Sequence, residues 1–238
     1  MAASHVFSPW FSCVARPLSR LAFVSFFIIA ASLAAPLAAQ PVKPSDEAPR
    51  DRSLVALRSV VIAAAKKRDI NALLRHVDPA ATIGDSNAKG HAAWRNFLRR
   101  KPEFWDELVW ILEHGGKFGS RDDGGNRVFT APYMAKLGIT LSDSHVVVVA
   151  ANVPAYASPR RNSPVLATYS HELLKLEKWD KARLETPFYR SSGWVEIQTR
   201  QNKPAFLEAR FVRAVKEHQL RFQKAGDTWQ IIYFLAGD

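Results

Sequence analysis

Hydrophobic residues recur at helical spacing in the first half of the chain. After Ser53, which stands where a helix cap is expected, apolar side chains return every three or four residues. A second run of this kind opens at Asp69 and stops at Asp78 and Pro79, and two more cover 91–100 and 103–114. The pattern predicts that residues 53–137 form a mainly helical domain.

The period of the pattern changes from about Leu141 onward. Short runs rich in Val, Ile, Tyr, Phe and Trp follow one another, with turn residues between them. The runs read VVVVA, VPAYA, PVLATY, ELLKLE, GWVEIQT and AFLEARFV. Strands of this length and spacing are typical of a small β-barrel. We therefore predict a barrel over residues 141–213.

The end of the chain has the pattern of a further β-hairpin. Residues 217–224 alternate around Leu220 and Phe222, a turn is predicted at 225–227, and residues 228–235 are largely apolar. An isolated hairpin is only marginally stable in water, and the helices need a partner for faces that carry several tryptophans. We therefore predict an α+β fold in which residues 214–238 pack back on the helical domain, with the barrel inserted. An NTF2-like cone, with helices on a curved sheet, is one architecture of this kind.

Residues 1–39 have the order of a secretory signal. Arg16 and Arg20 precede an apolar run over 21–34, and small residues end the segment at Ala39. Cleavage after Ala39 predicts a periplasmic protein. The alternative is an uncleaved anchor, the one case in which we expect contact with a membrane. Residues 40–52 are charged and rich in proline, which predicts a flexible linker.

Composition excludes some kinds of site and favours some partners. The single cysteine, Cys13, lies in the signal segment, so a chain cleaved after Ala39 has neither a disulfide nor a thiolate zinc site. The formal net charge of +11 becomes +9 once the two leader arginines are removed, because the leader has no acid. We therefore expect anionic partners at the cell envelope and no nucleic acid, since the charges are scattered. Solubility alone is a competing explanation of the charge.

Two stretches of the predicted barrel resemble the bacterial SH3 domain of exported proteins, the SH3b type. The first is SPVLAT at 163–168, which follows Asn152 and the Ser158 and Pro159 pair, and the second is GWVEIQT at 193–199. The segments KRDINALL, VDP, APY and WQIIYFLAGD are similar to a wider group of exported SH3-domain proteins of Gram-negative bacteria. The resemblance implies an SH3-like barrel and an envelope location, and it brings no known activity.

Aromatic side chains from the first long loop and the last turn line the binding face of SH3-like barrels, so the resemblance suggests ligand-binding residues by position. Together with the two arginines of the SPRRNSP loop, the candidates are Tyr156, Arg160, Arg161, Tyr169, Tyr189 and Trp194. Burial in the core is the competing interpretation for Trp194.

These observations together predict a non-enzymatic binding module. Its partner would be a cell-wall peptide or glycan, or an envelope protein, and we expect no catalytic residue, cofactor or metal. The alternative function is that of an envelope hydrolase whose site lies in an NTF2-like pocket of the helical half.

Overall fold

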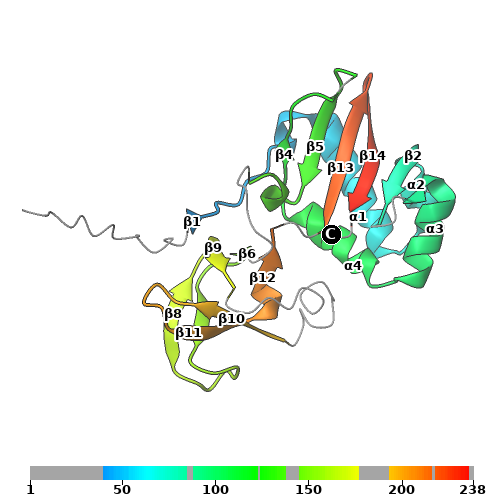
Figure 1. The fold of residues 1–238 in the computed structure, drawn as a ribbon. Coiled ribbons are helices and arrows are strands. Elements are labelled where there is room, and N and C mark those ends of the chain that lie inside the picture. The colour runs from blue at the N-terminus through cyan, green and yellow to red at the C-terminus, as the bar shows by residue number, and fades with distance from the viewer. Residues whose placement is uncertain are drawn as a thin grey trace, which may run out of the picture. The chain divides into compact units, whose positions relative to one another are not determined.

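The structure is a computed structural model that describes residues 40–84, 88–122, 124–137, 145–176, 193–215 and 218–235. The predicted signal segment therefore lies outside the described residues. Helices and strands both occur, so the protein is α+β (Figure 1). The helices are α1 (Arg52–Lys66), α2 (Ile70–Leu74), α3 (Gly90–Arg100) and α4 (Phe104–Glu113), with 3-10 turns η1 (Ala48–Arg50), η2 (Tyr133–Lys136) and η3 (Ala209–Phe211). Within the described ranges, no helix is long and apolar enough to cross a membrane.

A six-stranded sheet packs against these helices (Figure 1). In order across the sheet its strands are β3 (Ala88–Lys89), β2 (Val77–Ile83), β14 (Thr228–Leu235), β13 (Gln219–Ala225), β5 (Arg127–Ala131) and β4 (Lys117–Phe118). β14 and β2 run parallel, and the other neighbours are antiparallel. One apolar core joins helices and sheet, and it includes Leu54, Trp94, Leu108, Phe129 and Phe234.

The C-terminal hairpin occupies the middle of this sheet. β13 and β14 pair from Gln219 opposite Leu235 to Ala225 opposite Thr228. The connecting turn places Gly226 at a φ of 58°, a conformation that glycine adopts without strain. Because β13 pairs with β5 and β14 pairs with β2, the sheet is built from two segments that residues 145–214 separate in the sequence.

The helix boundaries show where local capping decides the start of a helix. The predicted cap at Ser53 is wrong: α1 begins at Arg52, and the Asp51 carboxylate accepts hydrogen bonds from the backbone N–H groups of Ser53 (3.1 Å) and Leu54 (3.3 Å). Asp69 caps α2 as its pattern predicts, by accepting a hydrogen bond from the Ala72 N–H at 2.9 Å.

The prediction of a mainly helical first half is incomplete. Val77, which the periodicity places on a helix face, instead begins strand β2. Pro79 has no N–H to donate within a helix, and the Asp78 carboxylate accepts a hydrogen bond from the Ala80 N–H at 2.7 Å instead. Strand β5 at Arg127–Ala131 is a second strand within this predicted helical domain.

Two four-stranded sheets make up the part that is predicted as a barrel. One has the order β1 (Gln40–Pro41), β9 (Glu172–Lys175), β6 (His145–Val148) and β12 (Val212–Ala214), and the other has the order β10 (Trp194–Gln198), β11 (Pro204–Glu208), β7 (Val153–Tyr156) and β8 (Val165–Tyr169). Side chains from both sheets share one core that includes Val146, Leu174, Val195 and Leu207. A single bridge between Leu176 and Ile197 joins the sheets, so the hydrogen bonding of the described strands does not close into a barrel.

The prediction of a flexible linker at residues 40–52 is wrong. Gln40 and Pro41 pair with β9, and the N–H of Val42 donates to the carbonyl oxygen of His171 at 2.6 Å. Val42 and Ala48 are buried in apolar clusters. The prediction rests on a composition that is rich in proline and charge, which indicates only that the segment has low hydrophobicity. Such a composition does not predict hydrogen bonds between the backbone of this segment and distant parts of the fold.

Candidate functional site

Successive residues in β10 and β11 of the sheet β10-β11-β7-β8 alternate between its buried face and its outer face. Along β10, Val195 and Ile197 are buried, while Trp194, Glu196 and Gln198 are half-buried. Along β11, Ala205 and Leu207 are buried and Phe206 is half-buried. Side chains of a strand point alternately to opposite faces, so Trp194 and Phe206 stand on the side away from the core.

Three aromatic residues gather on this outer face, and we call them the aromatic face: Tyr156, Trp194 and Phe206. Tyr156 lies directly opposite Phe206 in the pairing of β7 with β11. The rings of Tyr156 and Trp194 meet edge to face, with centroids 5.6 Å apart and an interplanar angle of 83°. This geometry is a favourable one for aromatic pairs, and the rings keep part of their surface in solvent.

An ion-pair network borders the aromatic face. A guanidinium nitrogen of Arg161 lies 2.7 Å from the Glu208 carboxylate, and Nε of Arg210 lies 3.0 Å from the same group. Burial by itself would raise the pKa of Glu208, but the hydrogen bond from Arg161 and the charges of both arginines outweigh it and lower that pKa. Two cations therefore share one carboxylate, and the arginine side chains remain 68% and 48% exposed.

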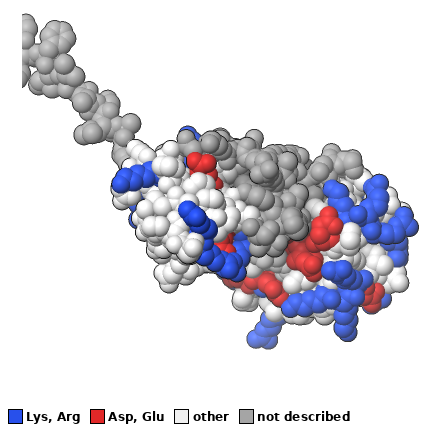
Figure 2. All heavy atoms as spheres, turned by 90° about the horizontal axis from the view of Figure 1, so that it is seen from below, with Lys and Arg blue, Asp and Glu red and all other residues white. Residues whose placement is uncertain are grey.

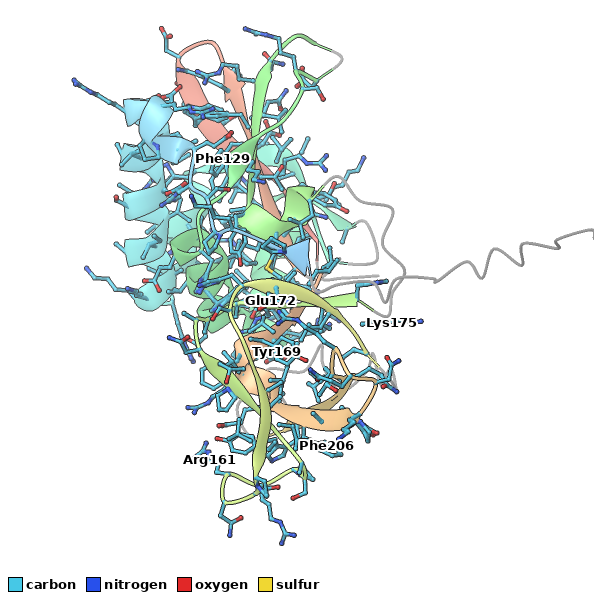
Figure 3. All side chains as sticks on the ribbon, turned by 90° about the vertical axis from the view of Figure 1, so that its left-hand side faces the viewer. Phe129, Arg161, Tyr169, Glu172, Lys175 and Phe206 are labelled. Carbon is cyan, nitrogen blue, oxygen red and sulfur yellow. The ribbon has the colours of Figure 1, made fainter. Side chains whose placement is uncertain are left out.

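The loop between β7 and β8 carries both arginines of the predicted pair, Arg160 and Arg161. Arg160 is exposed, and its Nε donates a hydrogen bond to the Ser158 hydroxyl oxygen at 3.1 Å. Arg161, labelled in Figure 3, follows it in the same loop. Its guanidinium group donates a hydrogen bond to the Glu208 carboxylate. Arg160, Arg161 and Arg210 outnumber the two carboxylates of this face, Glu208 and Glu196, and this excess favours a ligand with negative charge.

The structure brings together three of the predicted site residues and separates the others. Tyr156, Trp194 and Arg161 lie at one site, with Arg160 in the adjoining loop. Trp194 is half-buried on the outer face and not in the core. Tyr189 lies outside the described residues.

The prediction that Tyr169 binds the ligand is wrong, because its side chain is buried and only 1% exposed. A β-bulge shifts the pairing of β7 with β8 so that Ala155 opposes Ala167 while Tyr156 opposes Val165. The extra residue reverses the alternation, so Val165 faces outward and Tyr169 faces the core. Burial also raises the pKa of the Tyr169 hydroxyl.

The sequence interpretation misses Phe206, Glu208 and the exposed apolar pair Val165 and Leu166. Val165 is 54% exposed and Leu166 is 42% exposed. The signal for Phe206 is the alternation within PAFLE, where it lies between two buried residues. The pairing of Glu208 with Arg161 has no local signal, since the two residues are 47 positions apart in the sequence.

The helical half holds one buried polar pair. Nδ1 of His218 lies 3.0 Å from Oε1 of Glu107, and both side chains are more than nine-tenths buried. The neighbouring cavity has a volume of about 10 Å³, room for one water molecule. Between helices and sheet, the rings of Trp94 and Phe104 pack on Phe234 at centroid distances of 6.0 and 5.8 Å. These packed aromatic side chains fill the space between α3, α4 and β14.

The described residues contain no group of three or more His, Cys, Asp or Glu side chains that could hold a metal ion. On the face seen in Figure 2, basic side chains lie among acidic ones and do not form a single unbroken patch. What the outer sheet face can do chemically is bind: it offers ring surfaces, cations and exposed aliphatic groups next to one another.

Comparisons with known proteins give no family, and a solved structure offers a distant likeness. No protein-family model matches the chain, and no curated protein matches it. Among solved structures, the chain is similar to a protein of unknown function with a cystatin-like fold from Nostoc punctiforme. The two share 8% sequence identity with a TM-score of 0.28, and the match covers 82% of this chain and 95% of that chain.

Proposed function

We propose that the protein binds an anionic ligand of the cell envelope and catalyses no reaction, and that residues 141–213 are an SH3b-like binding module. The observation that carries the proposal is the aromatic face, where the edge-to-face pair of Tyr156 and Trp194 lies beside the Arg161–Glu208–Arg210 network. Aromatic rings supply contact area at a small cost in conformational entropy, and arginines bind carboxylates through paired N–H groups.

The topology supports the SH3b-like part of the proposal. Two small antiparallel sheets enclose a common core, and the long loop over 157–164 joins β7 and β8 beside the aromatic face. The segments SPVLAT and GWVEIQT, which carry the resemblance, fall on β8 and β10. These two strands lie at opposite ends of the sheet whose outer face holds the candidate site.

Charge supports the anionic character of the ligand. The chain has 33 basic residues against 22 acidic ones, and three of these arginines, Arg160, Arg161 and Arg210, stand at the site. Export to the periplasm, which the leader predicts, would place the module among wall peptides and glycans and envelope proteins. Exposed charges steer such ligands most strongly at low ionic strength.

A sedimentation assay with purified sacculi tests the proposal. The chain from Gln40 to Asp238, which contains every described residue, should sediment with sacculi at low salt and be released as salt increases. Phe206→Ala should weaken binding, whereas Val60→Ala, an apolar truncation at an exposed site on α1, should not. Turnover of generic ester and muropeptide substrates should stay at background. Turnover without binding would overturn the proposal and favour the hydrolase alternative.

A further inference from the structure

Strand β8 ends its sheet and presents an open edge. In the described part of the chain no strand pairs with its outer side. The other strands at sheet ends are shorter or partly covered: β1, β3 and β4 have two residues each, β12 has three buried residues, and β10 is bridged by Leu176. β8 is thus the five-residue edge at which a further strand could pair.

The edge of β8 carries no charged side chain within the strand, and its one protective feature is the bulge between Val165 and Ala167. Proteins commonly blunt such edges with charged side chains or very short strands. β8 reads VLATY and contains no charge, and Val165 and Leu166 are exposed by 54% and 42%. Only four large hydrophobic residues are exposed among the described residues, and two of them are these neighbours. An exposed apolar edge of this kind indicates an interaction site.

The hydrogen-bond pattern shows which backbone groups of β8 face outward. The N–H of Ala157 donates to the carbonyl oxygen of Pro164 at 2.9 Å, so these residues form a hydrogen-bonded pair beside the turn. Antiparallel pairs alternate between bonded and non-bonded kinds. Thr168 lies opposite Pro154, which has no N–H, and this pair is therefore of the non-bonded kind. The N–H and C=O groups of Thr168 thus point away from β7, toward the open edge.

The arginines next to this edge indicate the charge of the partner. The loop that carries Arg160 and Arg161 leads into β8 at Val165, and both arginines are exposed. Arg161 is already paired with Glu208, but that carboxylate is shared with Arg210. A strand that ran antiparallel to β8 would bring its C-terminal end beside the loop, where carboxylates would meet the arginines.

We propose that the ligand of this module is an extended, acidic polypeptide segment that adds a strand antiparallel to β8. The inference rests on the proposed function and names the class of its ligand, an acidic peptide chain. Backbone hydrogen bonds to the outward N–H and C=O groups of Thr168 supply affinity, the side chains of Val165 and Leu166 contact apolar residues of the segment, and the arginines select acids.

The probe is a synthetic heptapeptide in which valine and threonine alternate over five positions and the last two residues are glutamate. It should bind the chain from Gln40 to Asp238 in fluorescence anisotropy, and a version ending in two lysines should bind at least tenfold more weakly. Thr168→Pro removes one outward N–H and should weaken binding about tenfold. Thr168→Val keeps that N–H and should bind at least threefold more tightly than Thr168→Pro. Thermal unfolding verifies that both variants are folded.

Peptide methylation gives the sharpest contrast. Only alternate N–H groups of an added strand face β8, so one of two peptides methylated on alternate backbone nitrogens should lose binding while the other keeps it. Equal binding of the two, or equal binding by Thr168→Pro and wild type, overturns strand addition. If sacculi bind the protein and the peptide does not, strand addition is wrong and the proposed function stands. If neither binds, both proposals fail.

Discussion

Replacing Phe234 by alanine should destabilise the protein by about 4 kcal/mol, the middle of the range for a fully buried phenylalanine. The Phe234 side chain is 0% exposed, and its ring meets the rings of Trp94, Phe97 and Phe104 at centroid distances of 6.0, 6.1 and 5.8 Å. Because these partners come from α3 and α4, the helices cannot close over the space that the ring leaves without moving the sheet. Most of the cavity should therefore persist.

Urea unfolding, followed by tryptophan fluorescence, measures the effect. Of the seven tryptophans, Trp94, Trp105 and Trp229 belong to the core that contains Phe234 and Trp110 packs against it, so most of the signal reports this part of the chain. With a urea dependence of roughly 2 kcal/mol per molar, the midpoint should fall by about 2 M. Ile232→Ala is the matched control: this side chain is only half-buried, and its loss should cost about 1 kcal/mol or less. A fall no larger than that of the control would refute the assignment of the hairpin to the helical core.

Three further outcomes are expected. Burial would raise the pKa of Asp51, but hydrogen bonds from Ser53 and Lys224 outweigh it and lower that pKa. The ionised carboxylate therefore stabilises the fold fully above the unfolded pKa of about 3.9, and this stabilisation decreases as the pH falls below that value. The loss of thermal stability in Asp51→Asn should accordingly be smaller at pH 3 than at pH 7. Replacing both Arg160 and Arg161 by alanine should weaken binding to sacculi and flatten its salt dependence; unchanged binding at low salt would remove these arginines from the site. Tyr169→Phe should leave binding to sacculi unchanged, because the tyrosine is buried; a clear loss would contradict its placement in the core.

Local patterns in the sequence predict the elements whose partners are near in the chain. The spacing around Leu54 and Leu57 predicts α1, and the alternation around Leu220 and Phe222 predicts the hairpin. Strand β2 escapes prediction because its partner in the sheet, β14, is more than a hundred residues away and runs parallel to it. Such pairing depends on the whole fold and not on the local pattern.

The candidate site is predicted only in part for a similar reason. Tyr156 and Trp194 follow from residue type and position, because aromatic residues beside a long loop favour a binding surface. Tyr169 is assigned to the wrong face, since a single bulge residue reverses the alternation of β8 and no residue type marks the bulge. Glu208 belongs to the site because its carboxylate pairs with Arg161 of the loop over 157–164 and with Arg210. The contact with Arg161 forms only in the folded protein.

Hydrogen–deuterium exchange of the chain from Gln40 to Asp238, with and without saturating sacculi, tests the central claim that the outer face of the sheet β10-β11-β7-β8 binds the ligand. We expect added protection in 153–169 and 194–208, with no change in α1 or in the hairpin of β13 and β14. Protection confined to α1–α4 or to the six-stranded sheet, with none in these two segments, would contradict it.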